Sequence, residues 1–322
     1  MPKISIIVPV YNLENHLENT VNALTNQDEK DIEIILVNDG STDKSGEICE
    51  ALQKNDGRIA VLHTENRGVS AARNAGIRLA CGEFIGFCDG DDIPHRDMYS
   101  SLYSLAVKNG CQVVTAQTKI VFDDGSTSTT AKNRGEIIWD SKDQFMKEFL
   151  QGTFGFGACK MLFKAELAKT IDFEYGRKIN EDKMYVFEAL QKSDTVGFID
   201  KALYDYHRRS SSASYTEFSD KFFDAIYFAE KIHSIVKKQY PNLSDYSLLG
   251  LARAHLEILK LMVLENGISK FPEEWKKSIG FLKALDKKFC KKYFSKNEQI
   301  KMTALRINPQ CFKLAVKAFS KN

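Results

Sequence analysis

Four short runs of aliphatic residues recur at nearly even spacing early in the chain, and this regularity constrains the fold more than any other feature. The runs cover residues 4–10, 32–37, 59–62 and 84–88, so they begin 28, 27 and 25 residues apart. Segments of helical character separate them, at residues 14–27, 43–55 and 70–80. Strands that alternate with helices at this spacing predict βαβ units, and runs so rich in Val and Ile predict a parallel sheet that is covered on both faces.

The rest of the chain divides into a mixed segment and a helical segment. Residues 111–122 predict a strand, residues 141–150 a helix, residues 152–160 a glycine-rich loop, and a further helix is expected near Glu181. Residues 194–199 and 202–206 predict a hairpin or a pair of edge strands. From residue 217 onward the pattern is helical, with helices expected over 219–239, 245–264 and 272–286 and a weaker set after them.

Composition excludes several classes of protein. The 322 residues are 43% hydrophobic and 27% charged, which is typical of a globular protein of about two domains. The seven cysteines are odd in number and contain no C-x-x-C pair, which argues against a disulfide framework or zinc site and favours a reducing compartment. No signal-peptide pattern follows Met1, and no window of about 18 apolar residues is free of charge. We therefore expect a cytoplasmic protein.

The charge is unevenly spread, although it sums to only +2. Residues 270–322 hold 14 Lys and Arg against 4 Asp and Glu, whereas residues 1–269 hold 31 against 39. Apolar side chains alternate with these basic ones: Phe271, Trp275, Phe281, Leu285, Phe289, Tyr293, Phe294, Ile300, Leu305, Phe312 and Phe319. Two interpretations stay open, a basic amphipathic stretch on an anionic membrane surface and a helical cap with a basic outer face. No recognised module supports nucleic-acid binding.

Polar residues follow each of the four predicted strands. The clusters are Tyr11-Asn12, Asn38-Asp39-Gly40-Ser41-Thr42-Asp43, Glu65-Asn66-Arg67-Gly68 and Asp89-Gly90-Asp91-Asp92. Each cluster alone would be explained as a turn. Because ligands of open α/β sheets bind at the carboxyl ends of the strands, four such clusters in register predict a binding site there.

The residue types in these clusters indicate phosphate and metal chemistry. Adjacent carboxylates in the cluster that contains Asp91 suit Mg²⁺ or Mn²⁺, although a solvated acidic loop is the alternative. Gly90 would let a ligand approach the backbone. Arg73 lies among small residues on its predicted helix, so its guanidinium must find an anion such as phosphate or reach the surface. Asp39 would be the residue left free to accept hydrogen bonds from a nucleobase or ribose.

Two common nucleotide-binding motifs are missing. The first predicted strand ends in Pro9-Val10-Tyr11-Asn12 rather than G-x-G-x-x-G, which excludes a dinucleotide-binding domain. No G-x-x-x-x-G-K-[ST] loop is present, and residues 155–160 imitate one only superficially.

The motifs together resemble the family 2 glycosyltransferases of the GT-A fold. The resemblance is carried by residues 5–12, 37–43, 66–76 and 89–92, matches over about residues 3–125, and extends more weakly to about residue 215. It implies an α/β catalytic domain with a Rossmann-like mixed sheet over residues 1–215, with a nucleotide-binding half at 1–125 and an acceptor-side half at 126–215. Residues 216–322 would form a helical C-terminal extension.

The resemblance also implies an inverting transferase that uses a nucleotide-diphosphate sugar, usually a UDP-sugar, with Mn²⁺ or Mg²⁺. By position, the donor-binding residues would be Pro9, Tyr11, Asn12, Asp39, Asn66, Arg73, Asp89, Gly90, Asp91, His207 and Arg209. Asp91, with His207, would hold the metal. The chain departs from the family pattern at Asn38, where an aspartate is common, and at Gly90, where serine or alanine is common.

The family has an acidic pair that opens a later helix, and residues 180–183 fit it. We expect Asp182 to be the general base that removes the acceptor proton, with Glu181 as second choice or as an orienting group. A helix N-terminus that simply favours acids is the alternative. Arg209 fits a family arginine that is followed by S-x-S, and Lys160 begins a segment that resembles the acceptor side but suggests no role.

These expectations combine into a hexosyltransferase-type enzyme. It would transfer a sugar from a UDP-sugar to a hydroxyl of a glycan or lipid-linked acceptor in cell-surface polysaccharide synthesis, in the cytoplasm or peripherally on the inner face of the plasma membrane. A sugar nucleotidyltransferase is one alternative, although it would carry a glycine-rich loop after its first strand. A glycan- or nucleotide-binding protein without activity is another.

Overall fold

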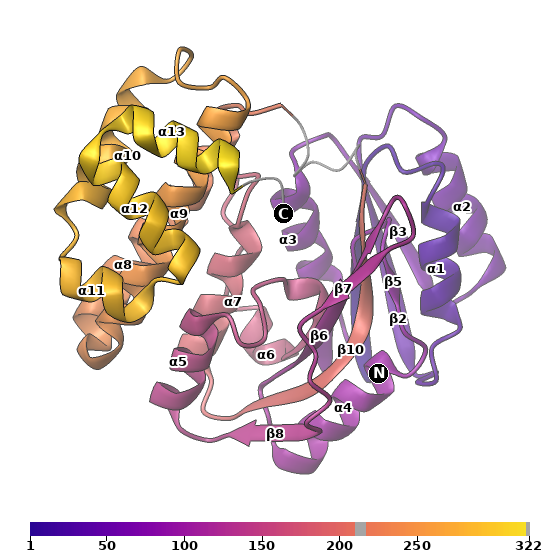
Figure 1. Ribbon diagram of the computed structural model, residues 1–322. Coiled ribbons are helices and arrows are strands. Elements are labelled where there is room, and N and C mark those ends of the chain that lie inside the picture. The colour runs from indigo at the N-terminus through magenta and orange to yellow at the C-terminus, as the bar shows by residue number, and fades with distance from the viewer. Residues whose placement is uncertain (210–216, 320–322) are drawn as a thin grey trace. The chain divides into compact units, whose positions relative to one another are not determined.

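A mixed β-sheet forms the centre of the first folding unit, residues 1–215, in the computed structural model (Figure 1). The structure describes residues 1–209 and 217–319. Within these ranges ten strands pair in the order β3-β2-β1-β4-β9-β6-β10-β5, with β7 on β6 and β8 on β10. The strands are β1 (Ile4–Val10), β2 (Ile32–Asp39), β3 (Ile59–Thr64), β4 (Phe84–Phe87), β5 (Ile93–Pro94), β6 (Val113–Phe122), β7 (Thr127–Thr129), β8 (Glu136–Trp139), β9 (Met161–Lys164) and β10 (Val196–Arg208).

The alternation of apolar runs and helices produces the parallel half of this sheet, as predicted. β1 lies between β2 and β4 and is parallel to both, and its residues Ile4, Ile6 and Ile7 are fully buried. Figure 1 shows α1 (Leu17–Thr25) and α2 (Ser45–Asn55) on one side of these strands and α3 (Val69–Leu79) on the other. The predicted α/β fold class is therefore confirmed.

Helix α3 packs closely on the sheet because it carries a glycine where it crosses β1. A Cβ added at Gly76 would lie 2.4 Å from Cγ2 of Ile7, well inside van der Waals contact. The neighbouring small residue Ala72 is also buried. This close packing helps to position the preceding turn of the helix, whose Arg73 lines a cavity with residues that follow β1 and β4.

The second half of the sheet mixes directions. β9 is antiparallel to both β4 and β6 and therefore inserts between two strands that run the same way. The helices that accompany this half are α4 (Met98–Asn109), α5 (Lys142–Gln151), α6 (Ala165–Ala168) and α7 (Glu181–Lys192). Because β9 is antiparallel to β4, its first residue lies at the edge of the sheet where β4 ends. The residues that precede β9, rather than those that follow it, therefore reach this edge.

The expectation of a hairpin or two edge strands at residues 194–206 is wrong. One long strand, β10, covers this segment and runs parallel to β6 inside the sheet, with an irregularity between Ile199 and Tyr204. Asp200, a polar residue in the middle of this strand, is fully buried. Its carboxylate accepts hydrogen bonds from the backbone N–H of Lys132 and from Nε of Arg134. These bonds stabilise the irregular segment of β10, where the register with β6 shifts.

The second folding unit, residues 216–322, is helical over its described residues, 217–319. Its helices are α8 (Asp224–Gln239), α9 (Ser244–Leu264), α10 (Pro272–Ala284), α11 (Lys287–Tyr293), α12 (Lys296–Ile307) and α13 (Pro309–Ala318). Three of them begin at residues that favour a helix N-terminus. Pro272 and Pro309 occupy the first turns of α10 and α13, and Ser295 forms a capping box with Glu298 at the start of α12. Across residues 1–209 and 217–319, no helix has the length and apolar run needed to span a membrane.

Most of the apolar residues in the basic C-terminal segment belong to the interior of this helical unit. The buried ones are Trp275, Leu285, Phe294, Leu305 and Phe312, and Phe271, Phe281, Phe289 and Tyr293 pack against them. Ile300 and Phe319 are exposed. The alternation of apolar and basic residues therefore mainly reflects the core and surface of a helical bundle.

Candidate active site

One cavity, with a volume of about 1070 Å³, lies at the carboxyl ends of β1 and β4. The predicted site residues that line it are Tyr11, Asn12, Arg73, Asp89, Asp91, Glu181, Asp182 and Arg209. They come from the loops after β1 and β4, from α3, from the start of α7 and from the residue after β10. The sheet order explains why they meet, because β1 and β4 are parallel neighbours and end at the same edge.

The remaining predicted residues, Pro9, Asp39, Asn66, Gly90 and His207, are not among those that line this cavity. Asp39 is only 3% exposed, and its two carboxylate oxygens accept hydrogen bonds from the backbone N–H groups of Arg67 at 2.9 Å and Gly68 at 2.8 Å. The carboxylate that we expected to be free for a nucleobase or ribose is therefore engaged by the protein. It fixes the loop that leads into α3.

Asn12 and Tyr11 form the entrance of the cavity on the β1 side. Asn12 has φ +53°, a left-handed conformation that asparagine tolerates better than most residues. Its side-chain oxygen accepts a hydrogen bond from the Thr42 backbone at 2.8 Å, and its own N–H donates to the Ser41 hydroxyl at 3.1 Å. These bonds join the loops after β1 and β2. They leave Tyr11, 48% exposed, with its ring at the cavity.

Arg73 connects three parts of the site. Its guanidinium donates to Asp89 at 2.9 Å and to Glu181 at 2.8 Å, and it lies 5.2 Å from the ring centroid of Phe173. Burial alone would lower the pKa of Arg73, which is 4% exposed, but Asp89 and then Glu181 outweigh burial and raise it well above its ordinary value. The anion that we expected for this arginine is supplied by two carboxylates of the protein.

Asp182 lies at the start of α7, one residue after Glu181. Burial raises the pKa of Asp182 to about 7, the adjacent Glu181 carboxylate adds to the rise, and Arg73 opposes it. One carboxylate oxygen accepts the backbone N–H of Lys183 at 2.8 Å, which fixes the side chain at the helix N-terminus. A carboxylate with a pKa near neutrality can accept a proton and release it at physiological pH.

Asp91 lies in the loop after β4 and is paired with Arg209. Nη1 of Arg209 donates to the Asp91 carboxylate at 2.7 Å, and Nη2 donates to the Asp91 backbone carbonyl at 2.8 Å. Burial raises the pKa of Asp91, the neighbouring Asp89 carboxylate raises it further, and Arg209 opposes both. Burial and the neighbouring carboxylate therefore both disfavour the ionised form of Asp91.

The donor set around Asp91 fits a divalent cation that the substrate helps to bind. Among the side chains that the structure describes, no group of three or more His, Cys, Asp or Glu is arranged to hold a metal ion. Mg²⁺, however, is often held by one or two carboxylates together with substrate phosphates. Burial and the repulsion from Asp89 raise the pKa of Asp91, and a bound cation would favour the ionised carboxylate against both effects.

His207, the other predicted metal ligand, is anchored through its backbone. Its N–H donates to the Asp92 carboxylate at 2.8 Å. Burial lowers the pKa of its imidazole, and Arg209 lowers it further against the opposing effect of Asp205. A neutral imidazole is the form that can bind a metal.

Asp92 and Tyr204 are important residues to which the sequence suggested no role. Asp92 is fully buried and accepts the Tyr204 hydroxyl at 2.9 Å, and that hydroxyl accepts the backbone N–H of Asp89 at 3.1 Å. Burial, then Asp89 and Asp91, raise the pKa of Asp92 well above its ordinary value. Asp92 belongs to the acidic cluster after β4, but nothing in the sequence indicated that a tyrosine of β10 would bind it and hold this loop in place.

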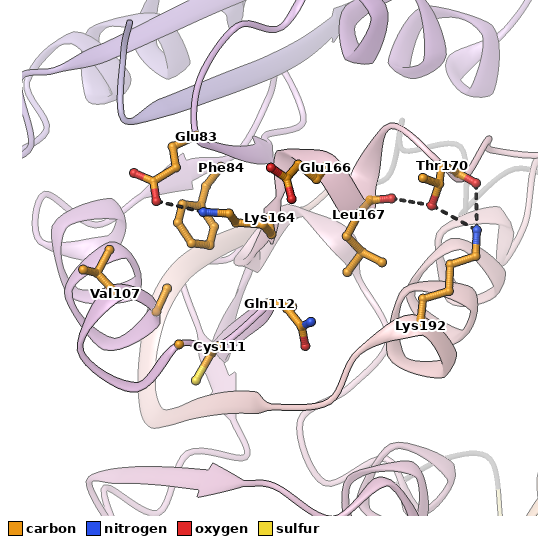
Figure 2. A pocket seen from close by; sticks show the side chains of 12 residues that line it. Glu83, Phe84, Val107, Cys111, Gln112, Lys164, Glu166, Leu167, Thr170 and Lys192 are labelled. Atoms are coloured by element: carbon orange, nitrogen blue, oxygen red, sulfur yellow. Dashed lines mark hydrogen bonds and ion pairs between the residues drawn. The ribbon is translucent and has the colours of Figure 1, made fainter.

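A second cavity, of about 550 Å³, lies at the amino ends of β4 and β6 and contains no predicted site residue. Figure 2 shows that its two lysines, Lys164 and Lys192, are paired with neighbouring groups. Lys164 forms an ion pair with Glu83 at 2.9 Å, and Lys192 donates to the Thr170 carbonyl at 2.8 Å. Its surroundings offer no cluster of catalytic groups comparable to that around Asp182.

Comparison with known proteins assigns the family. The sequence model described as "Glycosyl transferase family 2" matches residues 5–170. The uncharacterized glycosyltransferase EpsJ of Bacillus subtilis (strain 168) is 32% identical over 268 residues, which cover 82% of this chain and 75% of EpsJ. The minor teichoic acid biosynthesis protein GgaB of the same organism is 29% identical over 276 residues, which cover 83% of this chain and 30% of GgaB.

A solved structure shares the fold. The crystal structure of S. aureus TarS 1-349 in complex with UDP-GlcNAc aligns with a TM-score of 0.71 at 20% identity, over 99% of this chain and 92% of that chain. The family match spans the strands and loops that build the cavity around Arg73 and Asp91. The chain therefore belongs to the family 2 glycosyltransferases and has their GT-A fold.

Proposed function

We propose that this chain is an inverting, metal-dependent hexosyltransferase that moves a sugar from a UDP-sugar to a hydroxyl of a glycan or lipid-linked acceptor in cell-surface polysaccharide synthesis. Residues 1–215 would be the catalytic domain, with nucleotide binding in 1–125 and acceptor binding in 126–215, and residues 216–322 a basic extension. Family membership, the UDP-GlcNAc bound to TarS and the teichoic acid role in the name of GgaB support this proposal.

The observation that carries the proposal is the position of Asp182. It lines the same cavity as Asp91 and Arg209, and burial raises its pKa to about 7. An inverting displacement needs a base on one side of the sugar and positive charge at the leaving group on the other. Asp182 and Arg209 are the corresponding groups.

In this mechanism the Asp182 carboxylate accepts the proton of the acceptor hydroxyl as its oxygen attacks the anomeric carbon. The new carbon–oxygen bond forms while the bond to the diphosphate breaks, so the electron pair leaves with UDP and the proton remains on Asp182. Arg209 donates hydrogen bonds to the leaving diphosphate after exchanging its contact with Asp91. Arg73 keeps Glu181 and Asp89 in place beside the reacting centre.

A divalent cation held by Asp91, with His207 as a further ligand, would supply positive charge at the diphosphate when bound. Tyr11 and Asn12 line the cavity where the nucleoside would lie, with Pro9 and Asn66 as further contacts. Asp39 would act by fixing the loop before α3, and Gly90 by leaving space, since a Cβ there would lie 2.7 Å from Cδ1 of Leu13.

The test is UDP release from a panel of UDP-sugars, with and without Mn²⁺. Mn²⁺-dependent release of UDP from one sugar nucleotide supports the proposal. Release of pyrophosphate from a nucleoside triphosphate would instead indicate a nucleotidyltransferase, and UDP binding without turnover of any sugar nucleotide would indicate a binding protein. Family membership and the intact set of acidic residues favour the transferase.

We further propose that the basic extension brings the enzyme to the inner face of the plasma membrane. Residues 270–322 carry 14 basic against 4 acidic residues. Their aromatic side chains are mostly inside the helical unit, so the attraction would be mainly electrostatic, through exposed lysines and anionic headgroups.

A further inference from the structure

Lys160 is a buried lysine of the cavity to which the mechanism above gives no role. It ends the short 3₁₀ helix η1 (Ala158–Lys160) just before β9, and it is 5% exposed. Because β9 runs antiparallel to β4, Lys160 lies at the catalytic edge of the sheet and lines the same cavity as Asp182.

The glycine-rich loop before η1 wraps around this lysine. Gly155 has φ +69°, and a Cβ placed there would lie 2.9 Å from Nζ of Lys160. A Cβ at Gly157 would lie 3.7 Å from Oδ2 of Asp182. The loop therefore passes both Lys160 and Asp182 at close range, and larger side chains at these glycines would fill the space between the loop and the two charged groups.

The hydrogen bonds of Lys160 are incomplete. Its Nζ donates to the Phe154 carbonyl, the one acceptor that it reaches in the described part of the chain. An ammonium group carries three N–H donors, and a buried charge without partners is costly. Burial lowers the pKa of Lys160 to about 8, and the nearby Asp182 opposes this effect, so the ammonium form predominates at neutral pH.

Lys183 provides a useful contrast. It lies on α7 next to Asp182, and burial lowers its pKa to about 8 as well. Its ammonium, however, lies 4.1 Å from the ring centroid of Phe156, and Lys183 does not line the cavity. Two lysines of the same charge thus lie near one carboxylate, and only Lys160, the more buried of the two, lines the cavity where a substrate would lie.

The transferred sugar must lie between the diphosphate, near Asp91 and Arg209, and the acceptor hydroxyl, near Asp182. We infer that Lys160 is a sugar-binding residue, whose remaining N–H donors bind hydroxyl oxygens of the transferred sugar of the donor. This inference rests on the proposed function. It adds a specific contact from the loop side of the cavity that neither the family match nor the sequence motifs assigned.

Calorimetric titration of the full chain in MnCl₂ tests this inference, with UDP and with UDP-glucose, UDP-galactose and UDP-GlcNAc as probes. Lys160→Met should weaken binding of the preferred UDP-sugar about tenfold while UDP binding stays within about twofold, because only the sugar loses a charged hydrogen bond. Lys160→Arg should restore much of the loss. Lys183→Met, the matched control, should leave the ratio of the two affinities unchanged.

Equal weakening of UDP and UDP-sugar binding by Lys160→Met, or no weakening of either, would overturn the inference. Lys160→Gln keeps a donor for the Phe154 carbonyl and serves as the second variant if Lys160→Met lowers the unfolding temperature strongly. If the wild-type chain binds neither UDP nor any UDP-sugar, the proposed function itself fails, and that result is seen before any variant is compared.

Discussion

Replacing Asp182 with asparagine removes one negative charge from the cavity and leaves its shape almost unchanged. Burial raises the pKa of Asp182 to about 7, so the wild-type carboxylate is half protonated near neutrality and is a stronger base than an exposed aspartate. The amide of asparagine cannot accept the acceptor proton. Loss of a general base costs about 10²- to 10⁴-fold in rate, and we expect a fall in kcat within that range.

The wild-type pH profile provides an independent test of the same reasoning. A base acts in its deprotonated form, so kcat should fall as pH drops below about 7, roughly tenfold for each further pH unit. The assay is Mn²⁺-dependent UDP release across pH 5.5 to 8.5 for the preferred donor. UDP affinity, measured by calorimetry, should change little in Asp182→Asn because Asp91 and Arg209 remain in place.

Asp97→Asn is the matched control for this experiment. Asp97 forms an ion pair with Lys201 at 2.7 Å and does not line the cavity, so the same change of charge and shape should leave kcat unaltered. Turnover by Asp182→Asn within a few fold of wild type would refute the assignment of the base. So would a wild-type profile whose acidic limb lies near pH 4, the range of an ordinary aspartate.

Three further predictions follow from other residues. Asp91→Asn should abolish Mn²⁺-dependent UDP release, and it should weaken UDP binding when Mn²⁺ is present but not when EDTA removes the metal. If the wild-type chain bound UDP equally well in Mn²⁺ and in EDTA, a metal at Asp91 would be contradicted. Burial lowers the pKa of His255 to about 4 in the folded chain, whereas an exposed histidine in the unfolded chain has a pKa of about 6.5. As pH drops from 6.5 towards 4, the unfolded chain binds the proton and the folded chain does not, so the free energy of unfolding should fall by about 1.4 kcal/mol per pH unit. Urea unfolding followed by tryptophan fluorescence in a Trp139→Phe background, where Trp275 is the remaining tryptophan, measures this slope, which His255→Phe should flatten. The full chain should sediment with phosphatidylglycerol vesicles at low salt and be released at high salt, and equal binding to phosphatidylcholine would contradict an electrostatic contact.

The parallel half of the sheet was predictable because its signals are local. Runs such as residues 4–10 and 32–37 are continuous in apolar residues, since strands covered on both faces have no polar side to present. The direction of β9 and the length of β10 depend on pairing with strands far away in the sequence. Asp200 is a polar residue inside β10, and only its burial and its hydrogen bond with Arg134 show that it supports the strand.

The prediction of the site was limited in the same way, because the hydrogen-bond partners of its side chains come from distant parts of the sequence. The sequence placed Arg73, Asp91 and Asp182 near one edge, and they line one cavity. It did not indicate that the Asp39 carboxylate would accept the backbone N–H groups of the loop before α3. Which N–H groups approach a carboxylate depends on the folded backbone and cannot be deduced from the residue type. Nor did it single out Tyr204, whose partner Asp92 lies more than a hundred residues earlier in the chain.

The reversed direction of β9 has a consequence for how relatives of this enzyme can diversify. A parallel strand would deliver the segment after it to the reaction centre, but β9 delivers the segment before it, residues 152–160, while its own backbone stays fixed between β4 and β6. Insertions or substitutions in that segment can reshape one wall of the pocket without shifting the neighbouring ladder. New sugar preferences can thus arise there with little loss of stability of the fold.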